Sequence, residues 1–172
     1  LNMNLYDKAK VFSMAAHEAI GQKRKYTGEP YYFHPQRVAD ILQDVQYTLP
    51  EEAYAVALLH DVVEDTQVDL HTIGEVFGAK VEQGVALLTD MPTVEGGPNR
   101  KKRKELDRLR LSQAPAWVQT IKVADMIDNT STIVEYDPKF AKVYLEEKRL
   151  MIKGLTQADP ILLEQAQQQI KE

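Results

Sequence analysis

Apolar residues recur at three- and four-residue intervals through most of the chain, which is the spacing of one face of an α-helix. Helices are predicted over residues 11–20, 35–42, 51–59, 70–77, 81–88, 100–111 and 115–125, and two more open at Asp137-Pro138 and Asp159-Pro160. Loops are predicted where Gly and Pro gather, at 23–33 and 91–99. No alternating pattern is long enough to indicate a strand. The sequence therefore predicts an all-α fold, a single-domain helical bundle over residues 1–172.

The predicted helix over 51–59 is unusual because it has almost no polar face. Apolar side chains run nearly unbroken from Ala53 to Leu59, so this helix should be buried. The preceding run Thr48-Leu49-Pro50-Glu51 resembles a capping box that would open the helix.

One imidazole and three carboxylates follow this apolar run. At 3.6 residues per turn, His60 and Glu64 share a face, as do Asp61 and Asp65, so one rigid helix would present all four. Carboxylates in an apolar setting are costly unless a positive charge meets them, which favours a bound divalent cation. The plainer alternative is the exposed acidic end of an ordinary helix.

Two further positions complete a candidate metal site. His34 lies at a loop-to-helix junction beside Pro35, and Asp125 ends another apolar helical stretch, with Asn129 one turn later. The pattern is His…His-Asp…Asp, with gaps of 26 residues (34 to 60) and 64 residues (61 to 125). Two nitrogens and two oxygens from separate helices would leave open positions on an octahedral ion for water and substrate.

Composition narrows the class of protein and of metal. The 172 residues are 44% hydrophobic and 27% charged, as in an ordinary soluble globular protein. The absence of cysteine excludes disulfides, thiolate metal sites and a cysteine nucleophile, and leaves ligands that suit Mn, Fe, Mg or Zn. No signal peptide or membrane span is found, so a cytoplasmic protein without membrane contact is expected.

The charge is unevenly distributed. A net charge of −5 argues against general nucleic-acid binding, yet the run from Arg100 to Arg110 holds seven of the 21 basic residues. Lys23, Arg24 and Lys25 form a second basic group. Local basic groups near a metal site favour a small polyanionic ligand, although the 100–110 run is equally consistent with a solvated helix face.

Together these motifs resemble the HD phosphohydrolase superfamily, and within it the alarmone-hydrolase branch, which includes the Rel/Spo hydrolase domain and the single-domain metazoan SpoT homologue. The resemblance covers about residues 7–155. The matching pieces are Ala16-His17, Gly21-Gln22, Arg24-Lys25, Gly28-Glu29-Pro30-Tyr31 with His34-Pro35, the run from Ala57 to Thr66, Phe77-Gly78, and the run from Ile121 to Asp125 with Asn129.

The resemblance implies a metal-dependent enzyme that removes the 3′-pyrophosphate of guanosine tetra- or pentaphosphate (ppGpp or pppGpp), giving GDP or GTP and pyrophosphate. It implies one Mn²⁺ ion, and it implies that Glu64 and Asp65 position and activate the attacking water. The implied metal ligands are His34, His60, Asp61 and Asp125.

The resemblance also implies a set of nucleotide-binding residues. Arg24 would stack on the purine base, and Lys25 and Asn129 would bind phosphate or ribose. Thr132 and Tyr144 are further candidates. The loop before His34 differs by a residue from many bacterial members, so either Arg24 or Lys25 could be the stacking residue.

One more departure concerns the phosphates. The segment Leu88-Thr89-Asp90-Met91-Pro92 replaces the usual Thr-Lys continuation and so removes a basic residue, for which the run from Arg100 to Arg110 would compensate.

Other functions stay open. An HD enzyme of this type could act on adenine alarmones or on the 2′-phosphate of NADPH. A nucleotide-binding module without turnover is a third possibility, against which the intact pair Glu64-Asp65 argues. The sequence predicts no particular oligomeric state.

Overall fold

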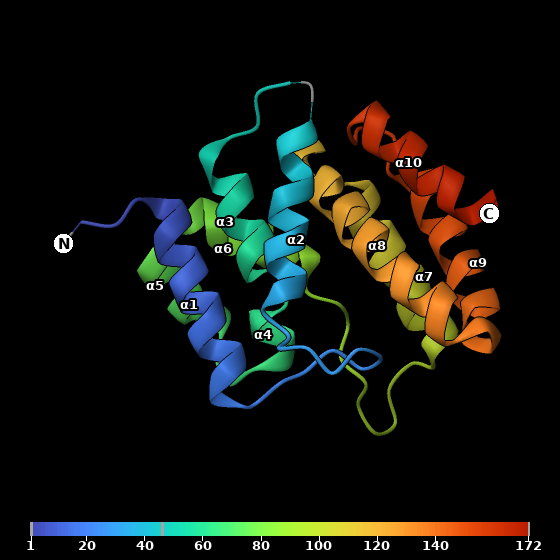
Figure 1. Ribbon diagram of the computed structural model, residues 1–172, viewed down its shortest axis with the longest axis horizontal. Helices are drawn as coiled ribbons and strands as arrows, with labels where there is room; N and C mark the ends of the chain where they lie inside the picture. Colours follow the sequence, from blue (N-terminus) through green and yellow to red (C-terminus); the bar gives the residue numbers. More distant parts are fainter. Residues whose placement is uncertain (1, 46, 172) are drawn as a thin grey trace. The chain divides into compact units, whose positions relative to one another are not determined.

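The computed structural model describes residues 2–45 and 47–171, so the expected domain ends at 1 and 172 lie outside the described residues. Those residues form helices and no sheet, which confirms the predicted all-α class (Figure 1). Contacts divide the chain into two compact units, one up to Thr89 and one from Asp90 onward. The expected single domain stays a prediction. No helix in the described ranges is long and apolar enough to cross a membrane.

The first unit is built around one buried helix. Its elements are α1 (Leu5–Ala19), α2 (Phe33–Ile41), the short 3-10 helix η1 (Leu42–Asp44), α3 (Glu51–Leu59), α4 (Val62–Asp65), α5 (Leu70–Phe77) and α6 (Ala79–Leu88). Helices α1, α2 and α6 pack against α3, in which six of the nine residues are buried, as the apolar run predicted. The predicted capping box is wrong, because α3 begins at Glu51 with Pro50 as N-cap and Thr48 lies too far upstream to cap it.

The chain breaks between α3 and α4, where a continuous helix was expected. Helix α3 ends at Leu59 and α4 begins at Val62, with His60 and Asp61 in the turn between them. Asp61 has φ −101° and ψ −1°, and its carbonyl still accepts the N–H of Asp65 at 3.0 Å. The turn therefore stays close to helical geometry, which is why the sequence pattern continues through it.

The loop between α1 and α2 is held by its own backbone. Gly21 and Gly28 have positive φ, which suits glycine, and Lys23 and Pro30 form an isolated bridge. The N–H of Tyr31 donates to the carbonyl of Gln22 at 2.9 Å. This folded loop fixes the side chains that precede His34, which lies in the first turn of α2.

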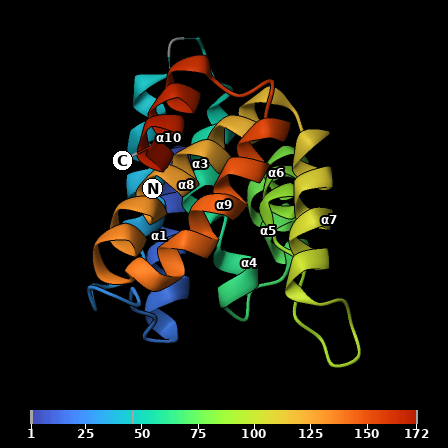
Figure 2. The ribbon, with the colours of Figure 1, turned by 90° about the vertical axis from the view of Figure 1, so that its right-hand side faces the viewer.

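The second unit packs around α8. Its helices are α7 (Arg100–Ser112), α8 (Ala116–Tyr136), α9 (Pro138–Gly154) and α10 (Pro160–Lys171), and both α9 and α10 lie along α8 (Figure 2). The two predicted starts are confirmed: Asp137 accepts the N–H of Phe140 at 3.1 Å, and Asp159 accepts that of Leu162 at 3.0 Å. Asp125 lies in the middle of α8, which continues well beyond the predicted stretch over 115–125 and carries Asn129 one turn later.

Candidate metal centre and active site

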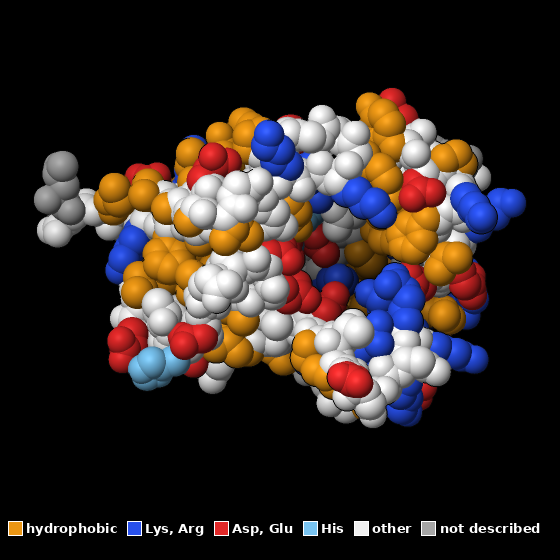
Figure 3. Space-filling view, turned by 90° about the horizontal axis from the view of Figure 1, so that it is seen from below, with side chains coloured by type: hydrophobic (Ala, Val, Ile, Leu, Met, Phe, Trp, Pro, Cys, Tyr) orange, Lys and Arg blue, Asp and Glu red, His pale blue; other side chains and the backbone are white. Residues whose placement is uncertain are grey.

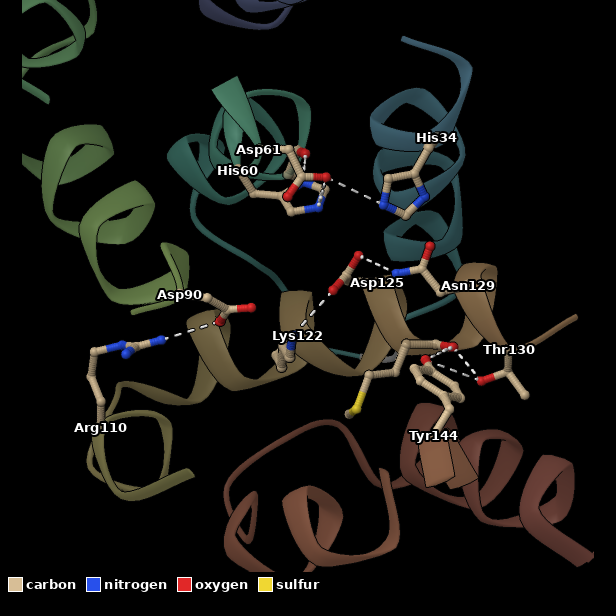
Figure 4. A network of polar contacts seen from close by, with 12 residues as sticks. His34, His60, Asp61, Asp90, Arg110, Lys122, Asp125, Asn129, Thr130 and Tyr144 are labelled. Carbon is tan, nitrogen blue, oxygen red and sulfur yellow. Dashed lines mark hydrogen bonds and ion pairs between the residues drawn. The ribbon is translucent and has the colours of Figure 1, made fainter. Parts of the chain in front are cut away.

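Two imidazoles and one carboxylate meet in the first unit. Asp61 Oδ2 lies 3.1 Å from Nε2 of His60 and 3.5 Å from Nε2 of His34 (Figure 4). The three ligand atoms lie within 4.8 Å of one another, and both histidines are buried. The turn after α3 and the first turn of α2 thus bring together residues that are 26 positions apart in sequence.

The hydrogen bonding of His60 indicates what this cluster can bind. Its Nδ1 lies 2.6 Å from the carbonyl oxygen of Ala57, which can only accept, so Nδ1 carries the proton. A neutral His60 then points the lone pair of Nε2 at Asp61 Oδ2. Two acceptors this close need a proton or a cation between them. The donor set of two nitrogens and a carboxylate therefore fits a divalent metal.

Tyr31 is a member of this site to which the sequence analysis gave no role. Its hydroxyl donates to Asp61 Oδ2 at 2.7 Å and so orients the carboxylate. The ring also packs on His34, with centroids 5.7 Å apart. The available signal was its position three residues before His34, at the end of a Gly- and Pro-rich loop.

The two proposed water-activating carboxylates lie in α4. Glu64 and Asp65 are both exposed to solvent. The pKa of Asp65 is raised, first because the surrounding protein partly desolvates its carboxyl and second because Asp61 is nearby. The side-chain N–H of Gln22 donates to Asp65 Oδ2 at 3.1 Å, which partly offsets this shift in pKa.

In the second unit, Asp125 is 8% exposed and has two neighbours on α8. Asn129 donates to its Oδ1 at 3.1 Å, and Lys122 Nζ lies 3.3 Å from its Oδ2 (Figure 4). The predicted placement of Asn129 one turn after Asp125 is therefore correct. Lys122 lies within the run from Ile121 to Asp125, and its spacing of three residues from Asp125 was the signal for this contact.

The comparisons with known proteins identify the family. A family profile described as HD domain matches residues 9–150. The chain belongs to the HD domain family. This confirms the resemblance to the HD superfamily.

Two curated relatives of this HD domain are much longer proteins. It is 33% identical over 154 residues to "GTP pyrophosphokinase rsh" of Brucella suis, covering 88% of the chain and 19% of the relative. It is 31% identical over 155 residues to a "Probable guanosine-3′,5′-bis(diphosphate) 3′-pyrophosphohydrolase" of Mycoplasma pneumoniae, covering 83% and 20%. The chain thus spans about a fifth of the length of the curated relatives it matches.

Solved structures share the fold. A metazoan ortholog of SpoT, described as hydrolyzing ppGpp and playing a role in starvation responses, aligns with TM-score 0.85 and 22% identity over 99% of this chain and 96% of its own. The protein lmo0812 of Listeria monocytogenes EGD-e aligns with TM-score 0.69 and 24% identity over 86% and 97%. These structures support the all-α HD fold.

The two expected base-stacking residues differ in their surroundings in this HD domain. The guanidinium of Arg24 lies 5.7 Å from the ring centroid of Tyr31, the same Tyr31 that bonds Asp61. Lys25 is exposed, and its Nζ lies 5.4 Å from the ring of Tyr26. Arg24 therefore contacts the side chain that bonds Asp61, whereas the ring contact described for Lys25 is with Tyr26.

The remaining expected nucleotide-binding residues already have partners inside the second unit. The hydroxyl of Thr132 donates to the carbonyl of Asn129 at 3.2 Å. Tyr144 on α9 donates to the carbonyl of Met126 at 3.3 Å, and burial raises the pKa of this phenol to about 12. Tyr144 thus stays protonated at ordinary pH.

The basic helix α7 uses part of its charge within its own unit. Figure 3 shows Lys and Arg side chains, in blue, gathered at the right of the view over the second unit. Arg100 forms two hydrogen bonds with Glu147, at 2.9 and 3.1 Å, and Arg110 binds Asp107 at 2.7 Å. The Arg100–Glu147 pair links α7 to α9, whereas Arg110 and Asp107 lie on the same helix. A compensating role of the run from Arg100 to Arg110 toward phosphates stays a prediction.

Proposed function

We propose that this HD domain hydrolyses the 3′-pyrophosphate of ppGpp and pppGpp, releasing pyrophosphate and GDP or GTP. The observation that carries the proposal is the convergence of His34, His60 and Asp61 in a geometry that fits a divalent cation. The relatives add the substrate class, because proteins named as GTP pyrophosphokinase and as a guanosine-bis(diphosphate) 3′-pyrophosphohydrolase share about a third of its residues over most of its length.

The proposed cofactor is one Mn²⁺ ion. His34, His60 and Asp61 would hold it, and Asp125 would complete the set, as the fourth position of the His…His-Asp…Asp pattern requires. Mixed imidazole and carboxylate ligands suit Mn²⁺ better than ions that prefer oxygen alone. When bound, such an ion lowers the pKa of water and polarises a phosphoryl oxygen.

The chain's own carboxylates would handle the proton of the attacking water. The raised pKa of Asp65 makes it a better proton acceptor than an ordinary carboxylate, since its conjugate acid is closer to neutral pH. Gln22 occupies Asp65 Oδ2, which leaves Oδ1 to face a water molecule. Glu64, on the same short helix, would orient that water.

Nucleotide recognition would begin at Arg24, whose planar guanidinium can lie flat against a purine. Its contact with the Tyr31 ring favours Arg24 over Lys25 as the stacking residue. Lys25 and Asn129 would bind phosphate or ribose. Thr132 and Tyr144 are weaker candidates for binding the nucleotide, because their hydroxyls already bond to carbonyls of α8.

The test is hydrolysis by the purified chain after removal of metal with a chelator. Readdition of Mn²⁺ should restore release of pyrophosphate and GDP from ppGpp, followed by phosphorus NMR, more effectively than Mg²⁺ or Zn²⁺. Release of orthophosphate from NADPH, or turnover of an adenine alarmone alone, would replace the proposed substrate with one of the alternatives.

Two histidine variants separate the site from general effects. His60→Ala should abolish metal binding and turnover. His71→Ala is the matched control, because His71 is 81% exposed and pairs only with Glu75 at 2.9 Å among the described contacts. Equal activity of the two variants would refute the metal site.

A further inference from the structure

A chain of side chains runs from α1 to the proposed water-activating carboxylate. Nδ1 of His17 lies 2.8 Å from Gln22 Oε1, and Gln22 Nε2 lies 3.1 Å from Asp65 Oδ2. His17 is on the buried face of α1, with an exposed fraction of 0%, and Gln22 is half-buried in the loop that follows. The three residues belong to three separate segments of the first unit.

The chemistry of the amide fixes the direction of both hydrogen bonds. An ionised carboxylate only accepts hydrogen bonds, so the NH₂ of Gln22 must face Asp65. The carbonyl oxygen of Gln22 then faces His17, and Nδ1 of His17 must carry the proton. The reverse orientation would set an amide oxygen against the carboxylate.

The surroundings of His17 favour the same tautomer. Its Nε2 is buried, with no hydrogen-bond partner among the described residues. A proton on Nε2 would be an unpaired buried donor, which costs the full desolvation of an N–H group. Burial lowers the pKa of His17, so the ring is neutral, and it packs on Tyr31 with centroids 4.9 Å apart.

We infer that His17 and Gln22 are positioning residues for Asp65: His17, locked as its Nδ1–H tautomer, orients the Gln22 amide, which holds one carboxylate oxygen and leaves the other to face water. The inference rests on the proposed function for its consequence in catalysis. The hydrogen bonds described for His17 and Gln22 lead to Asp65. Their effect should therefore fall on kcat, and nucleotide affinity and metal affinity should change little.

The first test reads the tautomer directly. Nitrogen-15 NMR of the full chain should show His17 neutral, with the proton on Nδ1. Gln22→Met, which removes the acceptor, should abolish the preference for Nδ1–H. Finding the proton on Nε2 in the wild-type protein would overturn the inference. This measurement needs no substrate, so it stands even if ppGpp is not hydrolysed.

The second test separates positioning from support of the fold. In His17→Asn, the side-chain NH₂ is bonded to Cγ, as Nδ1 is in histidine, so the variant keeps a hydrogen-bond donor at this place. It should retain kcat within about threefold. His17→Leu has no donor, and kcat should fall at least about tenfold with KM nearly unchanged, since small misplacements of a reacting group are costly. If His17→Leu does not fold, Gln22→Met, altered at a half-buried side chain, carries the same expectation.

Gln36→Met is the matched control, because Gln36 is a half-buried glutamine that donates to Tyr6 at 2.8 Å and Asp40 at 3.1 Å, away from Asp65. It should leave kcat unchanged.

Crystal structures add a readout independent of turnover: the distance from Gln22 Nε2 to Asp65 Oδ2 should stay near 3.1 Å in His17→Asn and lengthen in His17→Leu. Equal loss in the two His17 variants, or an unchanged distance in His17→Leu, would refute the positioning role.

Discussion

The buried lysine of α9 should make the stability of the protein depend on pH in the alkaline range. Lys148 is 1% exposed, and its Nζ donates to Thr130 Oγ1 at 2.8 Å and to Gln169 Oε1 at 2.6 Å. The described contacts supply no carboxylate to this ammonium group. Burial therefore lowers the pKa of Lys148 from 10.5 to about 8.

The sign and size of the effect follow from proton linkage. Between pH 8 and 10.5 the unfolded chain binds this proton and the folded chain does not, so the free energy of unfolding rises with pH across that window. A pKa difference of about 2.5 units corresponds to about 3 kcal/mol in total, most of it gained between pH 7 and pH 10. Below pH 8 the cost of burying the charge is fully present.

Lys148→Met removes the titrating group at similar length. The hydroxyl of Thr130 keeps its bond to the carbonyl of Met126 at 2.6 Å, and half-buried Gln169 can turn to water. Urea unfolding followed by circular dichroism at pH 7 and pH 10 should show wild type gaining about 2.5 kcal/mol more than the variant. Lys153→Met, exposed on the same helix, is the control and should track wild type. Parallel pH profiles of wild type and Lys148→Met would refute the reasoning.

Three further predictions concern the proposed site. Glu64→Gln and Asp65→Asn should each lower kcat at least about 100-fold with metal occupancy retained, measured by turnover and metal analysis; loss of metal would make that carboxylate a ligand instead. Arg24→Lys keeps the charge but loses the planar surface of the guanidinium, so KM should rise more than kcat falls. Lys25→Gln should weaken binding more for pppGpp than for a 3′-monophosphate. Equal loss of affinity for these ligands would place Lys25 away from the phosphates. Tyr31→Phe should weaken metal affinity about 10-fold or more by titration calorimetry, and unchanged affinity would show that its hydroxyl does not tune the carboxylate.

The parts of the fold that the sequence predicted are those governed by local chemistry. Asp137 and Asp159 start helices because their carboxylates accept a hydrogen bond from a backbone N–H three residues later, in the first turn. This local bond does not depend on the rest of the chain. Helix α3 is buried because its residues have no polar face to expose. His34, His60 and Asp61 could likewise be recognised as chemistry-bearing residues, because each stands beside an apolar or loop segment that isolates it.

The errors lie where local periodicity carries no information. A turn of nearly helical geometry at His60-Asp61 leaves the spacing of apolar residues intact, so the break is invisible to the pattern. The apolar stretch predicted over 115–125 continues as helix to Tyr136, and one face of α8 stays buried beyond Asp125, at Met126 and Thr130. The bond from Gln22 to Asp65 joins residues 43 positions apart, and only the folded loop brings them together.

The burial of Lys148 follows from its helical phase and not from its immediate neighbours in sequence. It lies in the charged run Glu146-Glu147-Lys148-Arg149, which favours a solvated surface. Its helical phase indicates the opposite, because residues three and four positions apart on that face are inward-facing: Ala141, Tyr144, Lys148, Met151 and Ile152.

This buried face matters for the helix that carries Asp125 and Asn129. Tyr144 bonds the carbonyl of Met126, and Lys148 bonds Thr130 and, through Gln169, reaches the carbonyl of Ile127. Three hydrogen-bonding groups of α8, between and just beyond the two proposed site residues, are thus fixed by α9 and α10. Burial of Lys148 in this polar layer of Tyr144, Lys148 and Gln169 costs stability at neutral pH, yet the layer holds a turn of α8 in place. This pattern is expected where the rigidity of a site matters more than the stability of the fold.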